Sequence, residues 1–203
     1  MTSHLLSAVA IAAFAFAAPV LAEANTSAKA VTAGNYAIET HHTQVLFSVN
    51  HLGFTDFYGQ FPGATGTLVL DPAKPAASHI DVTVPVASVD TANAKLDSEL
   101  VATDWLDATK YPTMHFVSTK VTVTGAKTAK VAGDLTMHGV TKPVVFDATF
   151  EGSGVNPMSK AYTSGFRISG TIKRSDFGVT KYVPLVSDEV KLIISAAFEK
   201  TPA

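Results

Sequence analysis

The chain has 203 residues, of which 47% are hydrophobic and 16% are charged, against a charged share of about 25% in typical globular domains. This composition excludes disorder as the default state. Fifteen Lys and Arg residues against seventeen Asp and Glu residues give a net charge of −2, which excludes the broad positive surface that nucleic-acid-binding proteins use. The chain has no cysteine, so disulfides, thiol catalysis and thiolate metal sites are excluded as well.

The first residues have the features of an export signal. Residues 5–18 are apolar except for Ser7, Pro19 ends this run, and Val20 and Ala22 occupy the two positions that a signal peptidase reads. The run is shorter than the roughly 20 residues of a membrane-spanning helix, and no later stretch approaches that length. We therefore expect a signal peptide over residues 1–22, export to the periplasm, and no stable membrane span.

The exported chain divides into a short tail and one domain. Residues 23–33 are small and polar and have no periodicity, which predicts a flexible N-terminal tail. From residue 34 onward, apolar and polar residues alternate in a way that is typical of half-buried strands. The clearest alternation covers residues 45–49, 80–86, 114–116, 144–150 and 190–198, with turn-forming residues between these runs. We expect residues 34–203 to form one all-β domain of about eight antiparallel strands, either a closed barrel or a sandwich.

A helical segment interrupts this pattern. Thr91 is a suitable N-cap for a helix over residues 92–100, in which Leu96 and Leu100 lie one turn apart. A second short turn is expected at residues 104–107, before Tyr111-Pro112 requires an extended backbone. The sequence therefore predicts a short helical insert near residues 91–107.

Sequence motifs of catalysis are missing. The chain has no nucleophile elbow, dinucleotide turn, phosphate loop, zinc-protease motif or calcium loop, so no catalytic residue, metal ligand or cofactor is assigned. His41 and His42 are neighbours, and on a strand they would point to opposite faces and not toward one ion. His51 has the same parity as Phe47 and Val49, which favours a structural histidine.

Several short motifs, in a fixed order along the domain, resemble one family. They are Tyr36-Ala37-Ile38-Glu39, Phe47-Ser48-Val49-Asn50-His51-Leu52-Gly53, Asp104-Trp105-Leu106-Asp107, Gly133-Asp134-Leu135-Thr136-Met137-His138-Gly139, and Lys173-Arg174-Ser175-Asp176-Phe177-Gly178. Each motif is weak alone, but the ordered set over residues 34–200 resembles the YceI-like family of exported polyisoprenoid-binding proteins.

The resemblance implies a lipocalin-like antiparallel barrel with a helical insert and an apolar channel. It also implies a periplasmic carrier of a long-chain isoprenoid or a similar lipid, such as a quinone, a polyprenol or a fatty amide, with no bond-making chemistry. Some members pair as dimers, so a homodimer is an expectation too. The ligand would be a hydrophobic small molecule, and no further cofactor is implied.

The helical insert departs from the family pattern. Where the family often has Arg-Asp-x-His-Leu, this chain has Leu96-Asp97-Ser98-Glu99-Leu100. If the missing cations hold a charged head group in relatives, this protein should disfavour a pyrophosphate and prefer a neutral head such as a quinone or an amide.

Parity and apolarity select the side chains that we expect to face the ligand. They are Phe47, Val49, Val82, Val84, Phe116, Phe146, Phe150, Leu192, Ile194 and Phe198, with Leu96, Leu100 and Trp105 as a lid. Three alternatives stay open. The barrel could be an enzyme that uses His51 or a buried carboxylate on a lipid, or a metal- or haem-linked module that uses His41, His42 or His51. It could also be a fully packed structural or interaction barrel, with Ile193 and Ala197 facing a partner.

Overall fold

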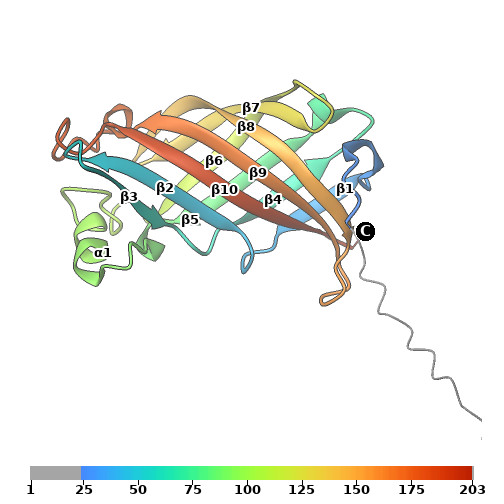
Figure 1. Cartoon of the computed structure of the whole chain (residues 1–203), viewed down its shortest axis with the longest axis horizontal. Helices are drawn as coiled ribbons and strands as arrows, with labels where there is room; N and C mark the ends of the chain where they lie inside the picture. The colour runs from blue at the N-terminus through green and yellow to red at the C-terminus, as the bar shows by residue number, and fades with distance from the viewer. Residues whose placement is uncertain (1–23, 203) are drawn as a thin grey trace, which may run out of the picture.

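The computed structural model describes residues 24–202, and these residues form a closed antiparallel β-barrel (Figure 1). The predicted leader over residues 1–22 lies outside the described residues. The strands are β1 (Gly34–Ile38), β2 (Gln44–His51), β3 (Thr55–Gln60), β4 (Thr65–Leu70), β5 (His79–Pro85), β6 (Thr113–Val123), β7 (Thr128–Met137), β8 (Val140–Val155), β9 (Tyr162–Lys173) and β10 (Glu189–Lys200). The short helices are η1 (Ala28–Ala30), η2 (Pro75–Ala77), η3 (Val86–Ser88), α1 (Ala94–Leu100) and η4 (Arg174–Phe177).

Ten strand segments occupy eight positions around the barrel. The order is β1-β4-β5-β6-β7-β8-β9-β10-β2-β3, and β1 also pairs with β10, which closes the sheet. β1 and β2 lie end to end along one edge of β10, because Ile38 pairs with Phe198 and Val45 pairs with Ile194. β4 and β3 likewise share the neighbouring position, because β4 pairs with β1 and β3 pairs with β2. The barrel of about eight antiparallel strands that we predicted is thereby confirmed, and the sandwich is excluded.

α1 lies at one end of the barrel, beside β3 (Figure 1). Its N-cap is Asn93, whose side chain accepts a hydrogen bond from the Leu96 amide, so Thr91 as the N-cap was wrong. The reason is the backbone at Ala92, which has a positive φ of 57° and cannot belong to the helix. The Thr91 hydroxyl instead donates to the carboxylate of Asp97 at 2.6 Å.

Residues 24–33, for which composition predicts a flexible tail, lie against the opposite end of the barrel. Asn25 exchanges two backbone hydrogen bonds with Ser153 in β8, at 2.8 and 2.9 Å. Val31 is buried, and the Thr32 amide donates to the hydroxyl of Tyr162. The apolar Val31 side chain gives this otherwise polar segment a reason to pack.

A carboxylate holds the corner between β1 and β2. Glu39 accepts hydrogen bonds from the backbone amides of His41 and His42 and also contacts the His42 ring. Burial alone would raise the pKa of Glu39, but the hydrogen bonds from His42 and His41 outweigh it and hold that pKa below its usual value. The ionised carboxylate therefore stabilises the bend that leads the chain from β1 to β2.

This corner predicts a pH dependence of stability. Because the folded-state pKa of Glu39 is lowered, its stabilisation is complete above the unfolded-state pKa and is lost as the pH falls through the folded-state value. Glu39→Gln should lower the unfolding free energy by about 1 kcal/mol at neutral pH. Denaturant unfolding at a series of pH values should show the two proteins converging in acid, and parallel curves would contradict this assignment.

Candidate ligand-binding cavity

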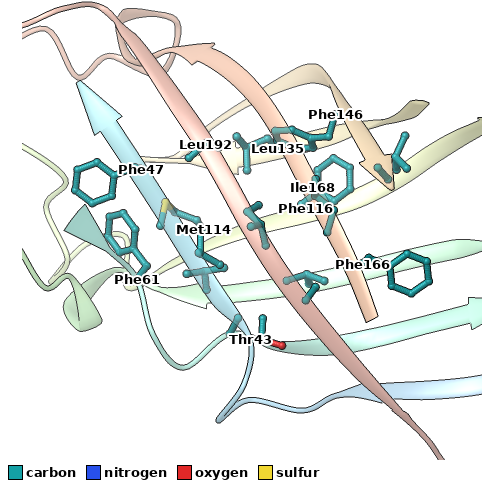
Figure 2. A pocket seen from close by; sticks show the side chains of 18 of the residues that line it. Thr43, Phe47, Phe61, Met114, Phe116, Leu135, Phe146, Phe166, Ile168 and Leu192 are labelled. Atoms are coloured by element: carbon teal, nitrogen blue, oxygen red, sulfur yellow. The ribbon is translucent and has the colours of Figure 1, made fainter. Parts of the chain in front are cut away.

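The barrel encloses a cavity of about 870 Å³, which falls in the upper part of the range for small-molecule sites. It extends from the end that carries α1, where Trp105 and Tyr182 line it, to the opposite end, where Ala28 and Lys29 line it. Figure 2 shows ten labelled lining side chains that point into the same space, eight from strands and two, Thr43 and Phe61, from the connections beside β2 and β3, and nine of the ten are apolar. They are Phe47, Phe61, Met114, Phe116, Leu135, Phe146, Phe166, Ile168, Leu192 and the single polar residue, Thr43.

All thirteen residues that the sequence assigns to the ligand line this cavity. They are Phe47, Val49, Val82, Val84, Leu96, Leu100, Trp105, Phe116, Phe146, Phe150, Leu192, Ile194 and Phe198. The strand pairings bring them together, for example Val82 beside Phe116 and Phe47 beside Leu192. Their contact with a bound ligand stays a prediction.

Sequence reasoning missed part of the lining. Phe166, Ile168 and Ile172 in β9 belong to it, as do Leu68 in β4 and Leu135 in β7. In β9 the signal was present, because these apolar residues alternate with polar or small ones, but the inward position 170 is a glycine and breaks the apolar run.

Two inward-facing glycines create space for phenylalanine rings along the barrel wall. A Cβ atom on Gly170 would lie 2.5 Å from the ring of Phe146, and one on Gly133 would lie 2.5 Å from the ring of Phe116. The two rings contact each other edge to face, with 5.3 Å between their centroids. Because each ring covers a glycine of the neighbouring strand, it occupies less of the lumen than it would over a larger residue.

Of the side chains labelled in Figure 2, Thr43 alone is polar, and its hydroxyl is hydrogen-bonded to the backbone. The hydroxyl of Thr43 donates to the Ala197 carbonyl at 3.3 Å and accepts from the Ala197 amide at 3.1 Å. Lys29 and Lys127 lie at the end that carries η1, and Lys95 and Glu99 lie on α1. Between the ends, His115 also lines the cavity, and its ring contacts Asp81. The centre therefore offers a ligand mainly apolar contact, and most of the polar lining groups lie at the ends.

Trp105 lines the α1 end of the cavity. The residue is buried, and its ring contacts Tyr182 edge-on with 5.9 Å between centroids. The guanidinium of Arg174 and the ammonium of Lys181 each lie 5.6 Å from the Trp105 ring centre, within cation–π range. Lys181 also forms an ion pair with Asp104, which joins the insert to the β9–β10 connection.

Arg174 organises the β9–β10 connection, residues 174–188. Its guanidinium donates four hydrogen bonds of 2.8–3.0 Å to the backbone carbonyl oxygens of Val179, Lys181, Val186 and Ser187. Burial lowers the pKa of Arg174, and the charge of Asp188 opposes that shift. Since arginine has five N–H donors, only one is left for a ligand, so this buried cation is mainly structural.

The histidines within residues 24–202 do not converge on a common site. The ring of His42 contacts Glu39, the ring of His115 contacts Asp81 at 2.7 Å, and His51 lines the cavity at its α1 end. Within the described part of the chain, no group of three or more His, Asp or Glu side chains is arranged as a metal site requires. Among residues 24–202, no helix is long and apolar enough to cross a membrane.

The closed eight-stranded barrel with an apolar interior defines a lipocalin-like binding barrel. A family model for the YceI-like domain matches residues 36–198, from β1 to β10. The chain belongs to the YceI-like family.

Relatives and solved structures agree with this membership. The chain is 45% identical over 165 residues to a UPF0312 protein of Pseudomonas savastanoi pv. phaseolicola, covering 80% of this chain and 85% of the relative. It is 42% identical over 183 residues to a UPF0312 protein of Ectopseudomonas mendocina, covering 89% and 95%.

Two solved structures show how far the likeness in three dimensions extends. BcnA of Burkholderia cenocepacia superposes with a TM-score of 0.72 at 27% identity, covering 79% of this chain and 98% of BcnA. A polyisoprenoid binding domain from Saccharophagus degradans superposes with a TM-score of 0.61 at 11% identity, covering 84% and 100%. At that identity, the second likeness shows a shared fold alone.

The packing of Phe146 on Gly170 generates a prediction. In Gly170→Ala, the new Cβ atom should push the Phe146 ring into the lumen, since that ring is its nearest neighbour. We expect a folded barrel with a smaller cavity and a cost of about 1–3 kcal/mol in stability. A crystal structure of the variant would locate the ring, and an unmoved ring with an unchanged cavity would contradict the role that we assign to this glycine.

Proposed function

We propose that this protein binds a long-chain isoprenoid or a similar lipid in the barrel cavity and carries or stores it in the periplasm. The observation that carries the proposal is the cavity inside the barrel, whose central wall is built from apolar side chains of many strands. Family membership supports the proposal, as does the shared fold with the Saccharophagus degradans domain, which is described as polyisoprenoid-binding.

The binding energy would come from apolar burial. Each carbon removed from water contributes about 0.8 kcal/mol, so one five-carbon isoprene unit contributes on the order of 4 kcal/mol. A few units would therefore outweigh the usual costs of immobilising a small molecule. Because such contacts are not directional, the length and shape of the cavity would select the chain.

We infer that the protein carries out no bond-making chemistry. An enzyme acting on lipid inside the barrel would need ionisable groups beside the reacting bond. The ionisable lining residues Lys29 and Lys127 lie toward one end, and Lys95, Glu99, His51, Arg174 and Tyr182 lie toward the α1 end. Between the ends, His115 contacts Asp81, and the labelled polar side chain Thr43 is bonded to backbone. This distribution favours a carrier over the enzyme and metal-module alternatives.

The location and the oligomeric state are further parts of the proposal. Export to the periplasm depends on the predicted signal peptide over residues 1–22. A homodimer could use the outer face of β10, where Ile193 is exposed and pairs with the equally outward Leu46 of β2. The inward wall would be the same in a monomer and in a dimer.

The first test is the lipid content of the protein. Protein purified from its own cells should carry a stoichiometric lipid in native mass spectrometry and lose it on denaturation. Val84→Trp, in the cavity wall, should weaken lipid binding at least tenfold, since the indole displaces about one isoprene unit. Val145→Trp, on an exposed site of β8, is the matched control. A protein that is purified without lipid and also takes up no added isoprenoid or quinone would contradict the proposed carrier function.

The lipid head group is proposed to be neutral, as in a quinone or an amide. Leu96 and Glu99 both line the cavity at its α1 end, in the positions where the family often has arginine and histidine. The negative charge of Glu99 would repel a pyrophosphate, and it offsets the charge of Lys95, which lies one turn away on the same helix. The nearby buried cation, Arg174, already donates four hydrogen bonds to backbone carbonyl oxygens.

Direct titration tests this preference. A prenyl quinone should bind at least tenfold more tightly than a prenyl pyrophosphate of equal chain length, a difference of about 1.4 kcal/mol. The double variant Leu96→Arg, Glu99→His should reverse or remove the preference. Ser98→Arg adds a charge to the same helix at an exposed site outside the cavity lining and should leave the preference unchanged. Equal or tighter binding of the pyrophosphate by the natural chain would contradict the proposed preference for a neutral head group.

A further inference from the structure

Exposed apolar side chains gather on two turns at the α1 end of the barrel. The β2–β3 turn carries Leu52 and Phe54, and Phe54 is 85% exposed. The β9–β10 connection carries Tyr182 and Leu185, and Leu185 is 63% exposed. These four residues are named here the apolar rim. Large apolar side chains in such positions lower solubility and bring no folding energy, so an exposed cluster marks an interaction site.

The two turns form one unit. His51 and Val186 pair as an isolated antiparallel bridge, and the Leu52 amide donates to the Leu185 carbonyl at 2.8 Å. The Ser187 amide donates to the Asn50 carbonyl at 2.9 Å. The apolar rim is therefore held in place by backbone hydrogen bonds that join its two halves.

The apolar rim is continuous with the cavity. Tyr182 belongs to both, because it lines the cavity and its ring contacts Trp105. His51 and Val186, the bridge that joins the two turns, line the cavity as well. In Figure 1 the end that carries the β2–β3 turn also carries α1. An object that binds the rim therefore lies directly at this end of the cavity.

The tips of both turns lack fixed charges. Residues 51–55 (His-Leu-Gly-Phe-Thr) and residues 182–186 (Tyr-Val-Pro-Leu-Val) contain no Asp, Glu, Lys or Arg. Moving the tips alone from water into the edge of a bilayer desolvates no charge. The charges that adjoin them are Asp56 on one side and Lys181 on the other, and Lys181 is already paired with Asp104. Tyrosine is also a residue that favours the boundary between water and lipid.

We propose that the apolar rim docks on the surface of an uncharged lipid bilayer, so that a lipid passes between the bilayer and the cavity without crossing water. This inference rests on the proposed function for its cargo. A second copy of the chain fits the rim less well. Four side chains of this kind present roughly 400 Å², about half of the 800 Å² per partner that a stable protein interface buries.

Docking through uncharged side chains predicts how vesicle binding depends on lipid charge and on salt. Because the tips of the rim are uncharged, binding to vesicles should not require anionic lipid and should not weaken in high salt. The insertion of a few side chains gives weak, reversible attachment, which a carrier needs in order to leave the membrane again.

Vesicle experiments on the full exported chain test the proposal. Phosphatidylcholine vesicles should bring the protein with them in flotation and should deliver a dansyl-labelled polyprenol to it. Phe54→Asp and Leu185→Asp should each slow this delivery and reduce flotation at least tenfold, since each removes a contact of about 1.4 kcal/mol or more. Met158→Asp is the matched control, because Met158 is 88% exposed on the β8–β9 turn.

A second readout separates this inference from the proposed function. Polyprenol presented on cyclodextrin should bind the rim variants and the natural chain with equal affinity, because none of the rim substitutions alters the central wall. Undiminished delivery from vesicles to the rim variants would overturn the docking site, and so would an equal loss in Met158→Asp. Loss of a dimer in the variants, without loss of flotation, would assign the rim to a second copy. Failure of the polyprenol to bind from cyclodextrin would instead reject the lipid cargo while flotation still reports docking.

Discussion

The antiparallel pairing of β1 with β10 closes the sheet, and the rest of the molecule depends on that closure. A closed barrel has no long unpaired edge at these strands, and it directs every second side chain toward one common space. An eight-stranded barrel is narrow enough to be filled by its own side chains or to hold one small ligand. Here Phe116 and Phe146 lie over Gly133 and Gly170, and the interior keeps about 870 Å³.

Closure leaves the two ends as the places where polar chemistry can enter. At the α1 end, the insert and the β9–β10 connection meet through Trp105, Tyr182 and the ion pair between Lys181 and Asp104. Arg174 shapes that connection by binding its carbonyl oxygens. At the other end, Ala28 and Lys29 of η1 and the buried Val31 line the cavity. The side chains that line the two ends are thus mostly on loops and on the insert, while the strands provide a largely apolar wall.

Much of the fold and the lining could be predicted because a strand has a period of exactly two residues per face. Parity alone placed Phe47, Val84 and Leu192 on the same side, and the structure has all three on the cavity. The start of α1 could not be predicted in this way, because Ala92 adopts a positive φ that its residue type does not favour. The inward face of β9 was not predicted because Gly170 interrupts its run of apolar residues. That same glycine leaves the space that the Phe146 ring occupies.

Whether a barrel is packed or hollow is not a property of any single strand, and therefore the cavity itself could not be derived from periodicity. The cavity depends on which residues lie side by side on neighbouring strands, such as Phe146 of β8 beside Gly170 of β9. The sequence pattern within one strand does not contain this register between strands.

The largely apolar wall also indicates which residues would make the barrel selective for one lipid. A wall of apolar side chains gains similar energy from any chain of suitable shape, so discrimination among lipids falls to residues outside it. In the function that we propose, Glu99 at the α1 end would act on the head group, and Phe54 on the apolar rim would act on the surface from which the lipid comes. Under this proposal, a carrier would change its cargo or its target membrane through a few end residues, while the strands that hold the barrel closed stay the same.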